Sequence, residues 1–406
     1  MEEFTRYILP NGIRCLHKQV RSAVTHCALT VNTGSRDELE SQHGLAHLLE
    51  HAFFKGTKRR KAFHINSRLE NLGGELNAYT TKEETVIHAT TLKGDLGKAA
   101  ELLSDIVFHS VFPAKEIAKE KEIIIDEINS YKDAPSERIY DDYEDLIFAG
   151  CSLGHNILGS KKSLMKYTRD DLLSFIGRTY NTDQMVFSVI GNHSPKRFQE
   201  ICDRYFADIP ANPRGFGRDL PPRYLPFTKF MSRNNHQAHC ILGNRAYSLQ
   251  DDKRITLGLL TNLLGGPSAN SLLNLAVRER NGLSYTIEAN YNSLSNTGYA
   301  SIYFGTDKEH VEQCIDIINQ EIEKILKGRI SDRLLALAKK QFLGQMTIAI
   351  ESNENYMLGA ARSYLHYNNV DSLDSFRDKI MSITRDELIE VAQEIYGQQI
   401  STLIYR

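Results

Sequence analysis

The sequence lacks the features that mark several large classes of protein. It has no apolar run of about 18 residues, so no membrane-spanning helix is predicted. Its formal net charge is −2 and charged residues make up 25% of the chain, which is not the basic composition of a nucleic-acid-binding protein. The N-terminus shows neither a basic segment followed by an apolar one nor an arginine-rich presequence. We therefore expect a cytoplasmic protein, of bacterial type.

Cysteine pairs are absent as well. The six cysteines are scattered along the chain and form no C-x-x-C pair. This spacing predicts neither a structural zinc knuckle nor a disulfide framework. We expect free thiols in a reducing compartment.

The length of the chain and an internal repeat predict two domains. At 406 residues, the chain exceeds what one hydrophobic core usually serves. The segment YTRDDL at 167–172 is echoed by ITRDEL at 383–388, an offset of 216 residues. The segment HCAL at 26–29 is echoed by HCIL at 239–242, an offset of 213 residues. Two matches at nearly the same offset indicate a duplicated unit.

Prolines indicate where the two domains meet. Five of the ten prolines lie between residues 210 and 226, which is typical of an extended linker. We predict an N-terminal domain at 1–207, a linker at 208–227 and a homologous C-terminal domain at 228–406.

Each half is predicted to be an α+β sandwich. The β-rich runs are a hairpin around Asn11-Gly12 and the segments 24–33, 76–91, 185–191, 283–293 and 400–405. Helical periodicity covers the segments 63–72, 95–110, 115–131 and 255–264. The expected fold is a mostly antiparallel sheet with helices on one face, formed twice.

One short motif points to chemistry. Apolar residues around His47-Leu48-Leu49-Glu50-His51 predict a helix, which puts both histidines on one face with Glu50 beside them. Two imidazoles and a carboxylate are the groups of a catalytic zinc site. H-x-x-E-H is the inverzincin signature, the reverse of H-E-x-x-H. The helix expected at 255–264 contains no histidine, so we predict one active site per chain.

A zinc site needs a third protein ligand. The helix expected at 115–131 offers Glu116, Glu120, Glu122, Asp126 and Glu127. Glu120 and Glu127 are two helical turns apart and share one face. One could bind the metal while the other orients it or a histidine. The spacing alone does not choose between them.

Nearly the whole chain resembles the pitrilysin/insulinase family of zinc peptidases, especially the short members related to the mitochondrial processing peptidase β subunit and to bacterial processing proteases. The block GLAHLLEHAFFKGT at 44–57 carries this resemblance most specifically. It implies that His47 and His51 bind zinc, that Glu50 is the general base and that Glu127 is the third ligand. Glu120 matches a neighbouring glutamate that assists the site. The N-terminal domain would then be the catalytic one.

The resemblance also implies a substrate site. The segment GGELNAYT at 73–80 resembles the strand beside the zinc, which would bind an extended peptide through Leu76, Asn77 and Ala78. In the second half, Arg278 and Tyr285 resemble a pair that reaches the scissile peptide. The implied activity is zinc-dependent endopeptidase cleavage of unstructured peptides. Because longer family members contain two such double-domain halves, we expect this chain to form a homodimer.

Other functions fit part of the pattern. A non-catalytic or heteromeric assembly subunit would show a broken zinc motif or a missing Arg/Tyr pair. In this sequence the zinc motif is intact and the Arg/Tyr pair is present. A zinc hydrolase for non-peptide substrates is disfavoured by the peptide-binding segment at 73–80. His43 lies one turn before His47 and could compete as a ligand, although we expect a polar residue at the start of the helix.

Overall fold

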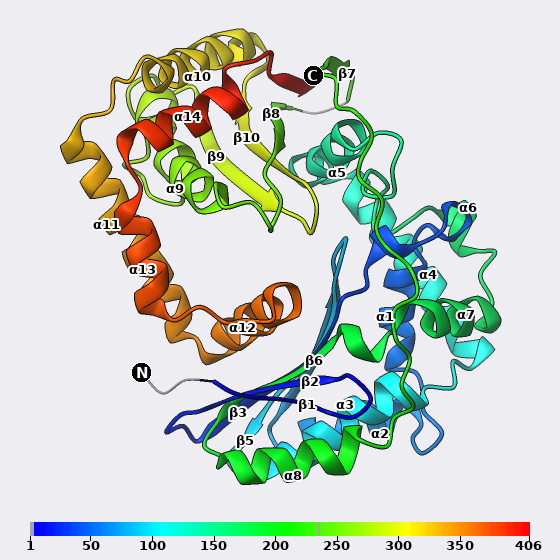
Figure 1. The fold of residues 1–406 in the computed structure, drawn as a ribbon. Coiled ribbons are helices and arrows are strands. Elements are labelled where there is room, and N and C mark those ends of the chain that lie inside the picture. The colour runs from blue at the N-terminus through cyan, green and yellow to red at the C-terminus, as the bar shows by residue number, and fades with distance from the viewer. Residues whose placement is uncertain (1–3, 234–235) are drawn as a thin grey trace. The chain divides into compact units, whose positions relative to one another are not determined.

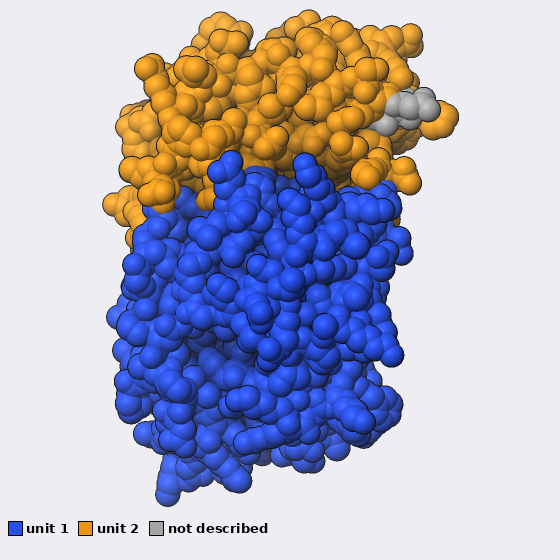
Figure 2. Space-filling view, turned by 90° about the vertical axis from the view of Figure 1, so that its right-hand side faces the viewer, with its two compact units in different colours: residues 1–129, 155–218, 349–371 blue, residues 130–154, 219–348, 372–406 orange. Residues whose placement is uncertain are grey.

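The computed structural model describes residues 4–233 and 236–406. They form two compact units, coloured separately in Figure 2. Unit 1 consists of 1–129, 155–218 and 349–371, and unit 2 of 130–154, 219–348 and 372–406. The segments 130–154 and 349–371 thus each pack with the other half of the chain. The division of the sequence into repeats at 207 and 228 stays a prediction, and no helix or strand lies between Phe206 and Thr228.

Unit 1 is built on a six-stranded sheet in the order β1-β2-β6-β3-β5-β4. Strands β2 and β6 are parallel and all other neighbours are antiparallel. The strands are β1 (Thr5–Ile8), β2 (Arg14–Gln19), β3 (Val24–Val31), β4 (Glu75–Thr80), β5 (Thr85–Leu92) and β6 (Met185–Gly191). The helices are α1 (Leu45–Phe53), α2 (Ala62–Glu70), α3 (Leu96–His109), most of α4 (Ala114–Lys132), α6 (Lys161–Leu164), α7 (Arg169–Thr179), α8 (Pro195–Phe206) and α12 (Asn353–Tyr367), with short turns η1 (Ser35–Asp37), η2 (Glu40–Gln42), η3 (Lys93–Asp95) and η4 (Thr182–Gln184).

Unit 2 is built on a five-stranded sheet in the order β7-β11-β8-β10-β9. Strands β7 and β11 are parallel and the other neighbours are antiparallel. The strands are β7 (Thr228–Met231), β8 (Ala238–Ala246), β9 (Ser284–Ser293), β10 (Gly298–Thr306) and β11 (Ser401–Tyr405). The helices are α5 (Pro135–Ile147), α9 (Arg254–Gly265), the π-helix η5 (Asn274–Glu279), α10 (Val311–Leu326), most of α11 (Asp332–Glu351), α13 (Leu373–Ser382) and α14 (Arg385–Tyr396), with the turn η6 (Lys308–His310).

Side chains alternate between the two faces of each sheet, and helices cover the central strands on both faces. In unit 1, Leu29 and Phe187 belong to the core under α1, α3, α7 and α8, while Ala28 and Ile190 on the other face pack against Met357 of α12. In unit 2, α5 covers the second face in the same way. Figure 1 shows α12 lying across the unit 1 sheet.

The predicted α+β class with mostly antiparallel sheets is confirmed. Each half's own helices lie on one face, as expected. The structure adds that the opposite face is covered by a helix from the other half of the chain.

One predicted strand is wrong. Residues 76–91 form two antiparallel strands, β4 and β5, and not a single one. The turn at 81–84 is closed by Thr81, whose backbone N–H donates to the Glu84 carbonyl oxygen (2.7 Å) and whose hydroxyl accepts the N–H of Glu84 (2.9 Å). A threonine hydroxyl that binds nearby backbone groups offers an alternative to continued strand pairing. The hairpin at Asn11-Gly12 is as predicted, with φ +96° at Gly12.

The structure bears on the expectations about membrane helices and cysteines. Among the described residues, no helix is both long and apolar enough to cross a membrane. All six cysteines are free thiols.

Candidate metal centre

Helix α1 presents the motif on one face and buries the other. Its residues Leu45, Leu48, Leu49, Ala52 and Phe53 lie in the core of unit 1. Gly44 precedes the helix with φ +93°, a conformation that glycine adopts readily. The buried Glu38 carboxylate accepts the N–H groups of Gly44 (3.0 Å) and Ala46 (2.7 Å) at the helix start. These contacts satisfy N–H groups that have no partner within the helix and fix where the motif begins.

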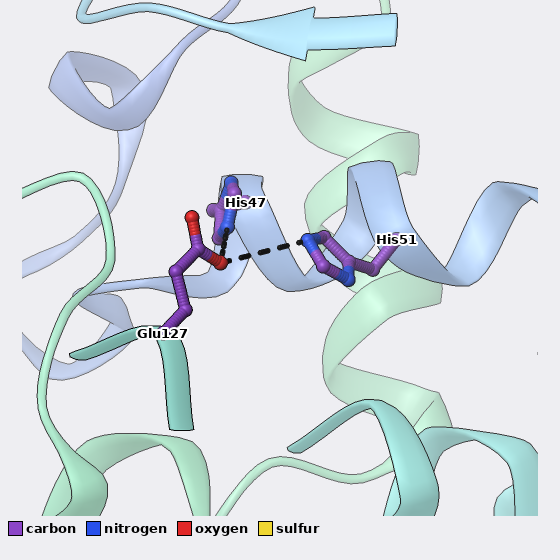
Figure 3. A group of neighbouring side chains, drawn as sticks. All are labelled: His47, His51 and Glu127. Atoms are coloured by element: carbon purple, nitrogen blue, oxygen red, sulfur yellow. Dashed lines mark hydrogen bonds and ion pairs between the residues drawn. The ribbon is translucent and has the colours of Figure 1, made fainter. Parts of the chain in front are cut away.

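Helix α4 brings a carboxylate to both histidines. Oε2 of Glu127 lies 3.2 Å from Nε2 of His47 and 3.9 Å from Nε2 of His51. Figure 3 shows dashed lines from one Glu127 carboxylate oxygen to both histidine rings. One potential ligand atom from each of the three residues falls within 4.8 Å of the others.

These three side chains fit a zinc ion by their chemistry. Two neutral imidazole nitrogens and one carboxylate oxygen leave a fourth position open, as in catalytic zinc sites. In the part of the chain that the structure describes, this is the one group of histidine, cysteine and acidic side chains close enough to hold a metal.

Glu120 lies on the far side of His51. Its Oε2 is 3.1 Å from Nδ1 of His51, and its Oε1 is 2.9 Å from Nζ of Lys55. Glu120 is buried, and it contacts the ring nitrogen opposite the one that faces Glu127. The geometry therefore gives the two glutamates different positions: Glu127 with both histidines and Glu120 behind one of them. A carboxylate in the latter position fixes a ligand's ring orientation and tautomer.

Glu50 lies next to this group, and one of its carboxylate oxygens makes no hydrogen bond with the described residues. Its Oε2 is buried without a hydrogen-bond partner and is 3.6 Å from Nδ1 of His47. Burial raises the pKa of Glu50, but His47, Thr80 and His51 together lower this pKa by more, so the carboxyl is ionised more readily than usual. Burial lowers the pKa of His47, but the Glu127 and Glu50 carboxylates together raise it by more, and the net result is a pKa of about 9. Protons therefore compete with a metal for His47.

Strand β4 borders the motif. It forms an edge of the unit 1 sheet, and its residues alternate between exposed and half-buried. Leu76, Asn77 and Ala78 line one cavity together with Glu50 and His51. The structure thus brings the predicted substrate residues next to the predicted base.

Arg278 and Tyr285 belong to unit 2. Arg278 lies in the last turn of the π-helix η5, is half exposed, and its guanidinium group is 3.8 Å from the Glu279 carboxylate. Tyr285 is on the edge strand β9, and 84% of its surface is exposed. Their action at the metal group in unit 1 stays a prediction.

The sequence did not predict three residues that support the motif helix, namely Glu38, Lys55 and His155. It also left open whether His43 binds the metal. Glu38 and Lys55 are described above. The Nε2–H group of His155 donates to the buried Glu38 carboxylate and to the Ser35 carbonyl oxygen, both at 3.0 Å. His43 stacks on His155, with ring centroids 3.8 Å apart, and is not part of the metal group. Lys55 could have been suspected because it lies one turn after His51. No spacing rule relates Glu38 to His155, since they meet only in the folded chain.

Two family models match the chain. The one described as "Insulinase (Peptidase family M16)" matches residues 15–161, and the one described as "Peptidase M16 inactive domain" matches residues 166–342. The second model covers much of the half that has no H-x-x-E-H motif.

Relatives of similar length extend this match. An uncharacterized zinc protease of Bacillus subtilis, YmxG, is 29% identical over 398 residues, 97% of this chain and 96% of its own. One from Streptomyces coelicolor is 28% identical over 404 residues, 97% of this chain and 87% of its own.

Solved structures share the fold. A protease from Helicobacter pylori has a TM-score of 0.91 at 20% identity, covering 100% of this chain and 99% of that one. A peptidase M16 inactive domain from Pseudomonas fluorescens has a TM-score of 0.93 at 18% identity, covering 100% and 98%. Because the two family models together match most of the sequence and relatives of the same length are zinc proteases by name, the chain belongs to the insulinase family of peptidases, family M16.

Proposed function

We propose that this protein is a zinc-dependent endopeptidase that hydrolyses unstructured peptides. The observation that carries the proposal is the meeting of His47, His51 and Glu127 beside the unpartnered buried oxygen of Glu50. The names of the relatives support the same chemistry.

Each residue of the centre has one role in this proposal. His47, His51 and Glu127 hold the zinc ion, and Glu120 orients the His51 ring. A bound zinc ion would polarise a water molecule and the scissile carbonyl group. Glu50 takes a proton from the attacking water on its free oxygen and later delivers that proton to the leaving amine.

Strand β4 is the proposed binding site for the peptide. It lies at the edge of its sheet, so an extended peptide can pair with it through main-chain hydrogen bonds. A folded protein cannot supply such a strand, which makes unstructured peptides the expected substrates. Arg278 and Tyr285 are proposed to contact the peptide from the second half.

The decisive experiment compares the zinc-loaded wild type with Glu50→Gln on a quenched fluorescent peptide. We expect Glu50→Gln to keep its zinc and its melting temperature while turnover falls by a factor of about 10³, because proton transfer of this kind contributes roughly 10² to 10⁴. Turnover by Glu50→Gln near the wild-type rate would refute the mechanism. A wild type that binds zinc and cleaves no peptide would favour the non-catalytic assembly subunit.

We further propose that the protein works as a cytoplasmic homodimer. Self-association around a twofold axis is the commonest way to close a chamber from one kind of chain. Light scattering coupled to size exclusion should give about twice the 46.1 kDa of one chain. A monomer with full activity at micromolar concentration, or a requirement for a related second subunit, would contradict the homodimer.

A further inference from the structure

The cavity beside the metal group has room for one substrate side chain. Its volume is about 320 Å³, at the lower end of the range for small-ligand sites. Its lining residues come from α1 and the turn after it, α2, β4 and α4, and all of them belong to unit 1. Glu50, His51 and Glu120 of the proposed centre belong to its lining, and the other lining residues are Phe54, Lys55, Asn66, Glu70, Leu76, Asn77 and Ala78.

The cavity lining combines a small apolar part with polar and charged side chains. Phe54, Leu76 and Ala78 are half-buried and also pack against the core of unit 1. Asn66 and Glu70 are one turn apart on α2, and both are exposed. A side chain that enters the cavity can therefore contact both apolar surface and the Glu70 carboxylate.

The charges in the cavity do not cancel. The Lys55 ammonium group is matched by the Glu120 carboxylate at 2.9 Å. The side-chain carboxylate of Glu70 has no ion-pair or hydrogen-bond partner among the described residues, and the nearby Arg68 lies 3.5 Å from Glu101. Glu50 is assigned to the reaction itself. Glu70 is thus the one charge lining the cavity that is free to be matched by a substrate.

We propose that this cavity receives the side chain of a residue next to the cleaved bond, and that Glu70 selects lysine or arginine there. The inference rests on the proposed peptidase function and adds a substrate class to it. The methylene stem of either residue would pack on Phe54 and Leu76 while the cationic end reaches Glu70. The site therefore favours long basic side chains over apolar ones of equal length.

The test uses matched peptides that differ at one position. Lysine, methionine or glutamate is placed on either side of the cleaved bond, which mass spectrometry identifies. We expect kcat/KM for lysine to exceed that for methionine by about fivefold at one of these positions, the size of a strong solvent-exposed ion pair. The ratio should fall to about one in Glu70→Gln and should fall with added salt, since salt screens exposed charges.

Two control variants test whether the preference belongs to the Glu70 carboxylate. Glu40→Gln removes an exposed carboxylate on η2, away from the cavity lining, and should leave the lysine-to-methionine ratio unchanged. Glu70→Lys should shift the preference to glutamate. A wild type that cleaves peptides without favouring lysine, or a preference that survives Glu70→Gln, overturns the selectivity proposal and leaves the peptidase proposal standing.

Peptide binding provides a readout that does not need turnover. Fluorescence anisotropy with the Glu50→Gln protein compares the Kd of the lysine and methionine peptides directly. The Glu50→Gln/Glu70→Gln double variant should lose the lysine preference. Equal Kd values for both peptides in Glu50→Gln would overturn the assignment of Glu70, even if no peptide were cleaved.

Discussion

The sheet of unit 1 and the sheet of unit 2 follow the same strand plan. The order β2-β6-β3-β5-β4 corresponds to β7-β11-β8-β10-β9, with the first pair parallel and the others antiparallel in both. The helix after the third strand differs: α1 keeps His47, Glu50 and His51 off its buried face, whereas α9 contains no histidine or acidic residue and buries most of its length. The shared fold therefore does not require the metal group, which one copy carries and the other lacks.

The sheets also differ where the parallel strands lie. In unit 1, Phe187 of β6 pairs with Leu29 and packs against Phe206 of α8, with ring centroids 4.5 Å apart. In unit 2, Thr402 of β11 pairs with Leu242 in the same register and lines an open cavity of about 560 Å³. The residue type at this strand position thus correlates with its cover: it is an aromatic residue where a helix packs on it and a threonine where it lines a cavity.

The largest expected effect comes from making the centre of unit 1 resemble unit 2. Helix α11, the counterpart of α4, is acidic only at its ends, so Glu127→Gln gives α4 the neutral character of α11 at this position. We expect zinc content to fall from one ion per chain to near zero and peptide turnover to fall to background, because a ligand is lost. Elemental analysis of the purified protein measures the first and a fluorescent peptide the second.

Glu120→Gln is the matched control on the same helix face. It should retain zinc but bind it roughly 10 to 100 times more weakly, the usual cost of losing a carboxylate behind a ligand. Competition with a chelator measures this change. If Glu120→Gln loses the metal and Glu127→Gln keeps it, the two roles are reversed.

A smaller effect tests the difference between the two parallel strands. Phe187→Ala should destabilise unit 1 by about 3–5 kcal/mol, because it opens a cavity under α8. Thr402→Ala should cost unit 2 about 1 kcal/mol or less. Urea denaturation followed by circular dichroism measures both, and hydrogen exchange in β6 and β11 assigns each change to its unit. Equal losses of unfolding free energy in the two variants would mean that the cover of helix α8 does not cause the difference between the two strand positions.

Much of this arrangement could be predicted from the sequence because local rules govern it. The turn at Gly12, the helix around His47 and the repeated strand-helix pattern depend on residues close together in the chain. Helix spacing placed Glu120 and Glu127 on one face, but only the folded distances distinguish them.

The rest depended on contacts that no spacing encodes. Amphipathic periodicity in α5 and α12 predicts that each helix buries a face, yet not which sheet it covers, so the exchange of these helices was missed. Glu38 lies shortly before α1 in the sequence but 117 residues from His155, and its role appears only when all three come together.

The last difference between the halves concerns Tyr285 of unit 2. This residue is predicted to assist the peptide hydrolysis that we propose for the centre in unit 1. Peptide hydrolysis builds negative charge on the carbonyl oxygen, and a phenol hydroxyl would stabilise that charge by donating a hydrogen bond. Tyr285 suits this role because its ring is 84% exposed and its hydroxyl has no hydrogen-bond partner among the described residues. Removal of that hydroxyl should therefore cost the folded protein almost nothing.

We predict that Tyr285→Phe leaves zinc content, melting temperature and KM nearly unchanged while kcat falls by a factor on the order of 10², the typical cost of losing one preorganised oxyanion donor. That factor corresponds to about 2.7 kcal/mol of transition-state stabilisation. Tyr291→Phe is a matched control on the same strand, because its hydroxyl instead donates to the Tyr247 carbonyl oxygen at 2.8 Å and should affect stability but not kcat. A kcat within about threefold of wild type in Tyr285→Phe would limit the contribution of this hydroxyl to less than ~1 kcal/mol. Unit 2 would then contribute substrate binding alone, and the chemistry would belong wholly to unit 1.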